Sequence, residues 1–232
     1  MTSVDKQIEV LFQISRALVG KQSLDEVLQQ IVIRTADLID SKICSLMLLD
    51  EKKENLVIRA TQSLSAAYRS KPPIHVGQSI SGKAVQTKKV YQVKDVTLDP
   101  SYGYPVIARQ EGLQSLLSVP MMIGDEVIGV LNCYTAEQKY FSPTEIQLVQ
   151  TIANHAAIAI EHMRVVAEKT QMKATLETRK SLDQAKRILM QRYHMSENDA
   201  HHLLQKMSME RNKPLRDIAD AIVLAAELPV LT

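Results

Sequence analysis

The chain of 232 residues has no tryptophan, two cysteines and seven glycines, and aromatic residues make up 4% of it. With so few aromatic side chains, its hydrophobic cores must be built mainly from Leu, Ile, Val, Ala and Met. No apolar stretch approaches the roughly 18 uncharged residues of a membrane-spanning helix, so the sequence predicts no membrane span. The chain also does not open with a basic segment, an apolar run and a small-residue cleavage site, so we expect a cytoplasmic protein.

The scarcity of cysteine bears on redox chemistry and on metal binding. Cys44 and Cys133 each lie in an apolar, strand-like run, which predicts two buried free thiols rather than a disulfide. The six histidines are dispersed, and the adjacent His201 and His202 would point to different faces of a helix. This is poor geometry for metal coordination, so no metal site and no cofactor are predicted.

Helix-breaking residues are absent from a long segment, since no glycine or proline occurs from Thr144 to Lys213. Ser142 fits an N-cap and Pro143 a first helical position, so a helix is predicted to start there. Apolar residues then recur through Val165 and Met172 at a spacing close to a heptad repeat, with charged interruptions. Such a helix is typical of a dimeric coiled coil, and packing within one chain is the alternative.

The first 140 residues predict an α+β fold. Helices are expected over 4–18 and 23–38, the second opened by a capping box between Ser23 and Glu26. Short apolar and β-branched runs predict a set of strands, which cover 43–49, 55–61, 90–96, 114–123 and 127–135. Two loop-like regions, 70–82 and 97–112, lie between the early and late strands, and Tyr102, Tyr104 and Arg109 are candidates to line a pocket there.

Positive charge is concentrated in one segment although the whole chain has a formal net charge of +2. From Lys169 to Arg192 there are seven cations and two acids, whereas the remainder from Tyr193 has four cations and six acids. After this basic segment, helices are expected to restart at Ser196 and near Pro214. A helix that packs on one side and presents clustered cations on another suits a polyanion.

Two family resemblances cover nearly the whole chain. Residues 20–162 resemble a GAF domain, most clearly over 115–121 and 128–131. Residues 171–228 resemble an ANTAR domain, the RNA-binding output module of bacterial transcription antiterminators. The residues that carry this second resemblance are Arg179, Lys180, Leu182, Ala185, Lys186, Ile188, Leu189, Met190, Ser196, Ala200, Leu203, Leu204, Ser208, Met209, Asn212, Leu215, Ile218, Ala219 and Ile222.

The resemblances imply a domain plan and a set of RNA contacts. We expect a GAF sensor domain over 1–162 with its N-terminal helix, a helical coiled-coil linker over 163–178 and a three-helix ANTAR domain over 179–228. The predicted RNA-binding residues are Arg179, Lys180, Lys186, Arg187, Asn212 and Lys213. Arg187 stands where the family commonly has a small residue, so it either strains the packing or is exposed and adds a phosphate contact; the second reading is favoured. Asn212 fits equally well as the cap of the last helix, and Tyr193 and His194 either stack on a base or pack at the hinge.

The implied function is a non-enzymatic, signal-responsive regulator that promotes transcription antitermination by binding paired hairpins in leader RNA as a homodimer. At the GAF domain, a small-molecule pocket and a ligand-free dimerisation role both remain open. One alternative is a DNA-binding regulator, although acids such as Asp217 and Asp220 make the last helix a poor major-groove reader. Another is a GAF-fold methionine sulfoxide reductase, whose chemistry uses several cysteines in a pocket.

Overall fold

The computed structural model describes residues 23–63 and 65–227, and the chain divides into two compact units, Met1–Arg164 and Val165–Thr232. The helix predicted over 4–18 lies outside the described residues. Among the residues described, no helix is both long and apolar enough to cross a membrane.

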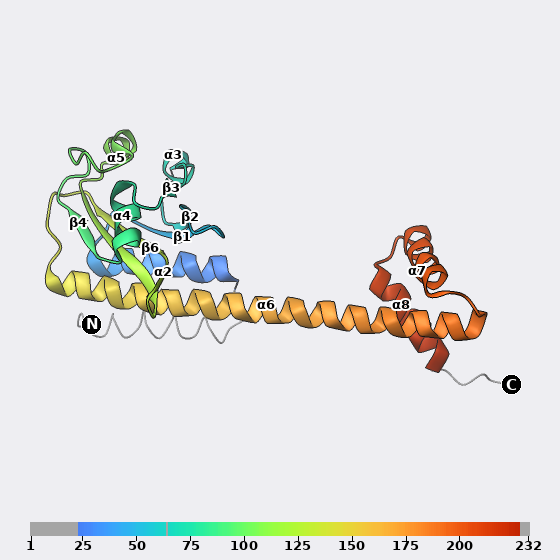
Figure 1. Ribbon diagram of the computed structural model, residues 1–232. Coiled ribbons are helices and arrows are strands. Elements are labelled where there is room, and N and C mark those ends of the chain that lie inside the picture. The colour runs from blue at the N-terminus through green and yellow to red at the C-terminus, as the bar shows by residue number, and fades with distance from the viewer. Residues whose placement is uncertain (1–22, 64, 228–232) are drawn as a thin grey trace. The chain divides into compact units, whose positions relative to one another are not determined.

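The first unit is built on one six-stranded antiparallel sheet in the order β3-β2-β1-β6-β5-β4 (Figure 1). The strands are β1 (Ile43–Leu49), β2 (Asn55–Thr61), β3 (Ile74–His75), β4 (Tyr91–Val93), β5 (Ser115–Ile123) and β6 (Glu126–Thr135). Both predicted hairpins are confirmed, since β1 pairs with β2 and β5 pairs with β6. The two hairpins join through β1 and β6, which makes β6 a central strand.

Helices flank this sheet, and their starts follow the predicted caps. They are α2 (Leu24–Ile39), α3 (Ala66–Arg69), α4 (Ser79–Thr87), α5 (Pro105–Glu111) and α6 (Pro143–Tyr193). The Ser23–Glu26 capping box forms as predicted, with the Glu26 carboxylate accepting from the Ser23 backbone N–H at 2.8 Å. Ser142 and Glu145 make the same exchange at the start of α6. That helix then continues unbroken, as the absence of glycine and proline predicts.

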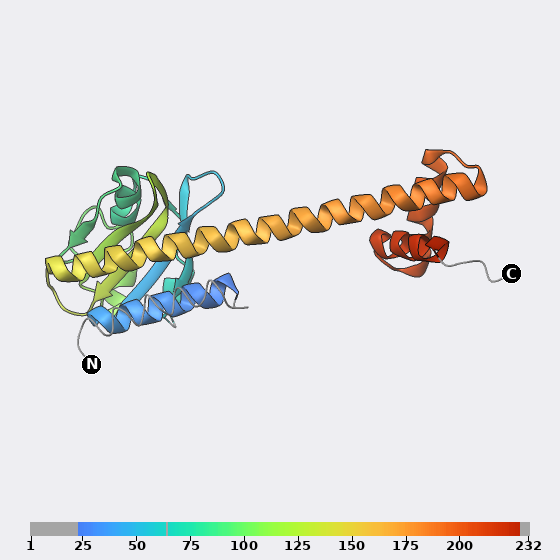
Figure 2. The ribbon, with the colours of Figure 1, turned by 90° about the horizontal axis from the view of Figure 1, so that it is seen from below.

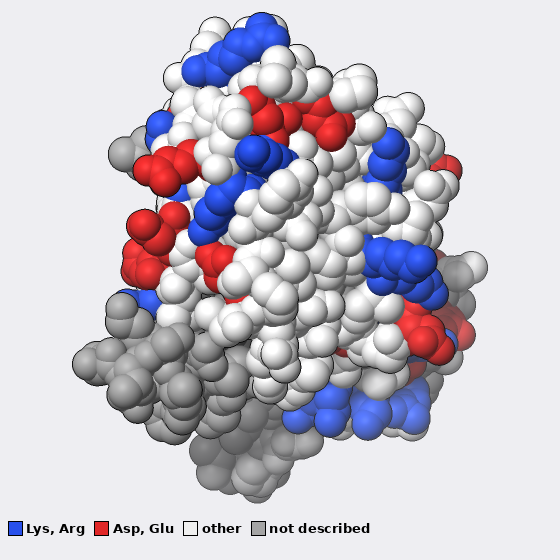
Figure 3. Space-filling view, turned by 90° about the vertical axis from the view of Figure 1, so that its left-hand side faces the viewer, with Lys and Arg blue, Asp and Glu red and all other residues white. Residues whose placement is uncertain are grey.

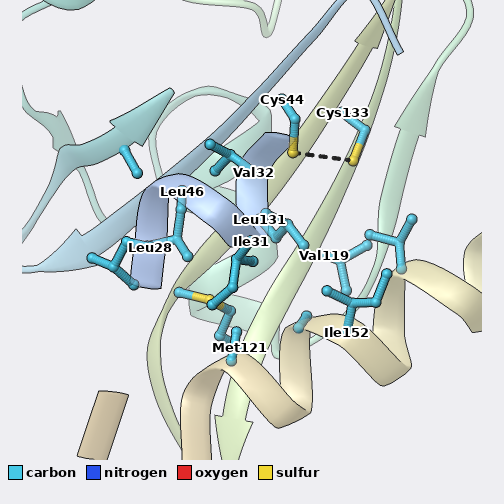
Figure 4. Close-up of a cluster of buried hydrophobic side chains, with 14 of the residues drawn as sticks. Leu28, Ile31, Val32, Cys44, Leu46, Val119, Met121, Leu131, Cys133 and Ile152 are labelled. Atoms are coloured by element: carbon cyan, nitrogen blue, oxygen red, sulfur yellow. Dashed lines mark hydrogen bonds between the residues drawn. The ribbon is translucent and has the colours of Figure 1, made fainter. Parts of the chain in front are cut away.

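The main hydrophobic core lies between one face of the sheet and the helices α2 and α6 (Figures 1 and 2). Alternate strand residues such as Leu46, Val119 and Leu131 meet Ile31 of α2 and Ile152 of α6 (Figure 4). Each of these side chains is almost completely buried. Burial of an aliphatic side chain of this size contributes about 1.5–3 kcal/mol, so this layer holds the unit together.

The opposite face of the sheet carries α3, α4 and α5 and a different set of side chains. Side chains alternate between the two faces along a strand, so the residues next to the aliphatic core residues point toward α3, α4 and α5. Tyr134 packs here with Tyr68 and Tyr102, and Met47 packs with Ala84 of α4. The two faces therefore differ in chemistry, aliphatic on one side and rich in tyrosine on the other.

The two cysteines are buried free thiols, as predicted. Cys44 and Cys133 are direct partners across the β1–β6 pair, and their Sγ atoms lie 3.8 Å apart in the layer under α2 and α6 (Figure 4). Burial is the main cause that raises the pKa of the Cys44 thiol well above its usual value. A raised pKa leaves little thiolate at neutral pH, so this thiol is a poor nucleophile.

Two predictions on this unit need correction. The strand expected over 90–96 is shorter, because only Tyr91–Val93 pairs with β5. The segments 70–82 and 97–112 are not simple loops: the first includes β3 and the start of α4, and the second contains α5. Tertiary packing stabilises these elements, which are too short to be recognised from periodicity.

The second unit contains the last part of α6 together with α7 (Glu197–Arg211) and α8 (Leu215–Glu227). Ser196 caps α7 as predicted, accepting from the Asp199 backbone N–H. The fully buried core of the unit is small and consists of Ala185, Leu189, Ala200, Leu204, Ile218 and Ala219. Half-buried side chains from all three helices, such as Leu182, Leu203 and Ile222, extend it. The three helices thus share one core.

Close packing at Gly129 of β6 gives a test of this fold. A Cβ atom there would lie 2.2 Å from the Met47 carbonyl oxygen, so Gly129→Ala should force the central strands apart. We expect a loss of about 1–3 kcal/mol in the free energy of unfolding. Urea titration followed by tyrosine fluorescence measures it, since every tyrosine except Tyr193 lies in the first unit.

Gly103→Ala is the matched control, because its added Cβ would make only ordinary contacts from 3.6 Å outward. We expect that variant to stay within about 0.5 kcal/mol of the parent. Equal stability of the two variants would contradict the β1–β6 register described above.

Candidate functional site

The predicted basic segment forms one side of α6 in the second unit. Arg179 and Lys186 are seven residues apart, as are Lys180 and Arg187, so each pair lies almost on one line along the helix. Arg179, Lys180 and Arg187 are exposed, and Lys186 is half-buried. The opposite side of the same turns carries the buried residue Ala185. The helix therefore presents Lys180 and Arg187 on the side turned away from its own core, and Arg179 and Lys186 at the border between that side and the core.

Arg187 is exposed, so the departure from a small residue does not strain the packing. Its side chain has no hydrogen bond or ion pair with another described residue. Arg179 and Lys180 are likewise without an ion pair in the described part of the chain. These three cations are available to an external anion.

Lys186 is placed differently from the other three. Its Nζ lies 2.7 Å from Glu197 Oε1 and 3.0 Å from Asp183 Oδ1, and its side chain is 18% exposed. The hydrogen bond to Glu197, followed by that to Asp183, raises the pKa of Lys186. The hydrogen bond between Lys186 and Asp183 is also the largest cause that lowers the pKa of Asp183. Lys186 thus links α6 to the first turn of α7, besides adding charge to the basic side.

An open groove of about 420 Å³ lies beside this basic side within the second unit. Its lining includes Arg179 and Lys186 from α6, His201 from α7, and the apolar side chain of Leu182. A groove with cationic edges and an apolar wall has the chemistry needed to hold a nucleobase beside its phosphate.

Asn212 and Lys213 lie in the turn between α7 and α8, and both are exposed. Asn212 has φ 49° and ψ 44°, and its backbone N–H donates to Met209 and Ser208 carbonyls. It therefore ends α7 in the left-handed conformation, which corrects the alternative that it caps the last helix. No hydrogen bond or ion pair among the described residues joins this turn to the four cations of α6.

Tyr193 and His194 mark the end of α6. His194 has a positive φ of 53°, which stops the helix. Tyr193 is 60% exposed, so it does not pack at a hinge. It is seven residues beyond Lys186 and fourteen beyond Arg179, which places an aromatic ring near the end of one row of cations.

In the first unit, a buried polar network lies on the tyrosine-rich face of the sheet. The Ser118 and Ser81 hydroxyls donate to Asn132 Oδ1 at 2.7 and 3.0 Å. On the neighbouring strand, Ser45 Oγ and the Tyr68 hydroxyl lie 3.0 Å apart. Sequence patterns alone did not indicate these groups, because the residues are dispersed along the chain.

The three residues that the sequence suggested as pocket lining differ in burial and in their contacts. Tyr102 is buried and Tyr104 is half-buried, and both rings lie within 6.0 Å of Lys71 Nζ. Arg109 is exposed and donates to the Thr97 carbonyl at 3.4 Å. On the face in Figure 3, uncharged side chains cover most of the view, and basic and acidic groups lie interspersed.

Comparisons with known proteins find one family match in each of the two units of the chain. A family model for the GAF domain matches residues 21–161, and one for the ANTAR domain matches residues 170–223. The formate hydrogenlyase transcriptional activator FhlA of Escherichia coli is 24% identical over 176 residues, which are 72% of this chain and 25% of that protein. A methyl sulfide methyltransferase-associated sensor of Methanosarcina acetivorans is 31% identical over 147 residues, 61% of this chain and 15% of the relative. The chain thus spans a quarter or less of the length of these two relatives.

Solved structures show the same fold for the first unit. The GAF domain of a phosphoenolpyruvate-protein phosphotransferase from Coxiella burnetii superposes with a TM-score of 0.63 at 23% identity, covering 72% of this chain and 99% of that one. The free methionine-R-sulfoxide reductase of Neisseria meningitidis gives a TM-score of 0.58 at 21% identity, covering 69% and 91%. With the matches over 21–161 and 170–223, the chain belongs to the GAF domain family and carries an ANTAR domain after its GAF domain.

Proposed function

We propose that this protein is a signal-responsive regulator that promotes transcription antitermination by binding paired hairpins in leader RNA. A GAF domain followed by an ANTAR domain supports a signal-sensing regulator with an RNA-binding output. The observation that carries the proposal is the row of cations on α6, exposed at Arg179, Lys180 and Arg187. RNA hairpins are recognised through phosphates, shape and unstacked loop bases, and an exposed cationic helix side supplies the phosphate contacts.

In this proposal the six predicted residues act in different ways. Arg179, Lys180 and Arg187 contact phosphates, and Lys186 adds charge while it holds α6 against α7. Asn212 and Lys213 contact the RNA from the α7–α8 turn. Tyr193 stacks on an unstacked loop base at the end of the cation row, where its exposed ring is free to do so.

We further infer that the active form is a homodimer joined along α6. Ile158, Val165 and Met172 follow one another at intervals of seven residues, and each is about half exposed or more. Leu176 continues the stripe and is 60% exposed. Apolar residues at heptad spacing form the seam of a two-stranded coiled coil, and a second copy offers the matching seam. A dimer would present two ANTAR domains to two hairpins.

A non-enzymatic sensing role for the GAF domain fits its cysteines. Cys44 and Cys133 are both completely buried, on the face of the sheet that packs against α2 and α6. A reductase needs thiols that its substrate can reach, so these two do not form such a site. A duplex-DNA reader is the other alternative, and Asp217 and Asp220 are exposed on α8, where they would repel phosphates.

Arg187→Ala should weaken hairpin binding without loss of fold, because this exposed side chain makes no hydrogen bond or ion pair with another described residue. We expect the slope of log affinity against log salt to fall in magnitude by about 1, the value for one lost phosphate contact. Filter-binding titrations with a two-hairpin leader RNA at several salt concentrations measure the slope.

Lys206→Ala removes an exposed cation of α7 whose only ion pair among the described residues is with Glu210 at 3.8 Å, and it serves as the control. It should leave the salt slope unchanged. Equal loss in the two variants would mean that general charge, rather than the α6 row, attracts the RNA. Stronger competition by duplex DNA than by hairpin RNA would favour the DNA-binding alternative.

Tyr193→Ala should weaken binding of a hairpin by about tenfold or more, since base stacking on an aromatic ring contributes about 1–3 kcal/mol. Tyr193→Phe keeps the ring and should bind as the parent does. Fluorescence anisotropy with a labelled hairpin measures both affinities. If Tyr193→Phe loses as much affinity as Tyr193→Ala, the hydroxyl rather than stacking is responsible.

Met172→Lys should convert the dimer to a monomer, because each strand of the coiled coil would place a buried charge in the seam. Gln171→Lys adds the same charge to the preceding exposed position, outside the stripe, and should leave the dimer intact. Size-exclusion chromatography with light scattering gives the masses. A parent chain that is monomeric and binds one hairpin would contradict the dimer.

A further inference from the structure

Lys71 of the GAF domain reaches into a group of four tyrosine rings, which we call the tyrosine cage. Its Nζ lies 3.6 Å from the centre of the Tyr68 ring. The centres of the Tyr104, Tyr134 and Tyr102 rings lie at 5.5, 5.6 and 6.0 Å. All four distances are within the range of cation–π attraction. The rings come from α3, from the segment before α5 and from β6, so the fold assembles the cage from distant parts of the chain.

The cage is held in place by its own contacts. Tyr134 meets both Tyr68 and Tyr102 edge to face, with ring centres 6.1 and 6.3 Å apart. The hydroxyl of Tyr68 is hydrogen-bonded to Ser45, and that of Tyr104 donates to the Pro72 carbonyl at 2.9 Å. Burial raises the pKa of the Tyr68, Tyr102 and Tyr134 phenols, which therefore stay neutral. A rigid, neutral cage is preorganised for a cation.

The lysine is a poor match for this cage. In the described part of the chain, its three N–H donors have neither a hydrogen-bond acceptor nor a carboxylate at ion-pair distance. Burial lowers the pKa of Lys71 to about 7, against the opposing influence of the Glu111 carboxylate. A primary ammonium loses part of its hydration here and receives mainly ring faces in return. A quaternary ammonium has no N–H groups to satisfy, so the same rings suit it better.

We propose that the tyrosine cage is a binding site for a small quaternary ammonium compound, and that Lys71 is an internal occupant which such a ligand displaces. The half-buried positions of Lys71 and Tyr104 leave the cage accessible from the surface. The ligand would leave Lys71 free to turn toward water, where its three donors are satisfied. The further statement that this ligand is the signal of the regulator rests on the sensing role proposed above.

Because Lys71 occupies the tyrosine cage, its protonation determines how binding of the quaternary ammonium ligand depends on pH. Above pH 7 the Lys71 amine is mostly neutral and loses its cation–π attraction, so displacement becomes easier and ligand affinity rises. The other titratable groups around Nζ are Tyr68 from α3, Tyr102 and Tyr104 before α5, Glu111 of α5 and Tyr134 of β6. The four phenols have raised pKa values and do not ionise between pH 6 and 8.

Calorimetric titration of the full chain with tetramethylammonium chloride, against sodium chloride at equal ionic strength, tests the proposal. We expect the parent to bind more tightly at pH 8 than at pH 6. Lys71→Met removes the competing ammonium and should bind about tenfold more tightly at pH 6, with no dependence on pH. Tyr68→Leu removes the nearest ring and should bind about tenfold more weakly, as expected for about 1–2 kcal/mol of cation–π attraction.

Two further probes decide between kinds of ligand. Neopentyl alcohol is similar in shape to tetramethylammonium but carries no charge. Binding of this alcohol as tight as that of tetramethylammonium would overturn the proposal. Binding of acetate that is lost in Lys71→Met would also overturn it, because Lys71 would then be an anion receptor.

A second variant guards against misfolding. Lys71→Arg keeps a cation in the cage and should weaken tetramethylammonium binding at both pH values, while circular dichroism confirms the fold. No binding by the parent and by a folded Lys71→Met variant would refute the site. Since no RNA is used, that result would leave the proposed RNA-binding function standing.

Discussion

The GAF unit depends on the burial of three central strands, β1, β6 and β5, on both faces at once. Each of these strands alternates between two chemistries, because adjacent side chains point to opposite faces. On β6, Leu131 and Cys133 enter the aliphatic layer, whereas Asn132 and Tyr134 enter the other. A shift of register by one residue would exchange the two sets, so pairing with both neighbours fixes which groups can meet a ligand.

This division separates the thiols from the candidate ligand site. The cysteines lie among Leu, Ile, Val and Ala side chains, where burial disfavours the thiolate. The hydroxyls, the amide and the tyrosine rings gather under the short helices, where polar groups can be satisfied and rings held. α6 packs on the aliphatic side through small residues, Ala153, Ala156 and Ala157, which allow close approach to the sheet. Close packing of this kind transmits displacement rather than absorbing it.

The ANTAR unit follows a different principle, because its fully buried core has six residues and three of them are alanine. Polar contacts between helices supplement this core: Lys186 pairs with Glu197 on α7, and Arg216 of α8 lies 3.3 Å from Glu177 on α6. Ion pairs at the protein surface, where water reaches at least one partner, contribute little each, so packing of the shared core remains the main stabilisation. The same arrangement leaves Arg179, Lys180 and Arg187 exposed and without an ion pair among the described residues.

The sequence by itself determined the elements whose signals are local: the capping boxes at Ser23 and Ser142, the two long hairpins, and the helix that continues to Tyr193 without glycine or proline. Helical spacing also sufficed to place four cations on one side of α6. Only the tertiary structure decided that Lys186 is ion-paired while Arg187 has no ion pair among the described residues, and that α5 exists within a segment resembling a loop. It alone brought Lys71 to tyrosines as far along the chain as Tyr134, because contacts between distant residues depend on sheet pairing that no local pattern encodes.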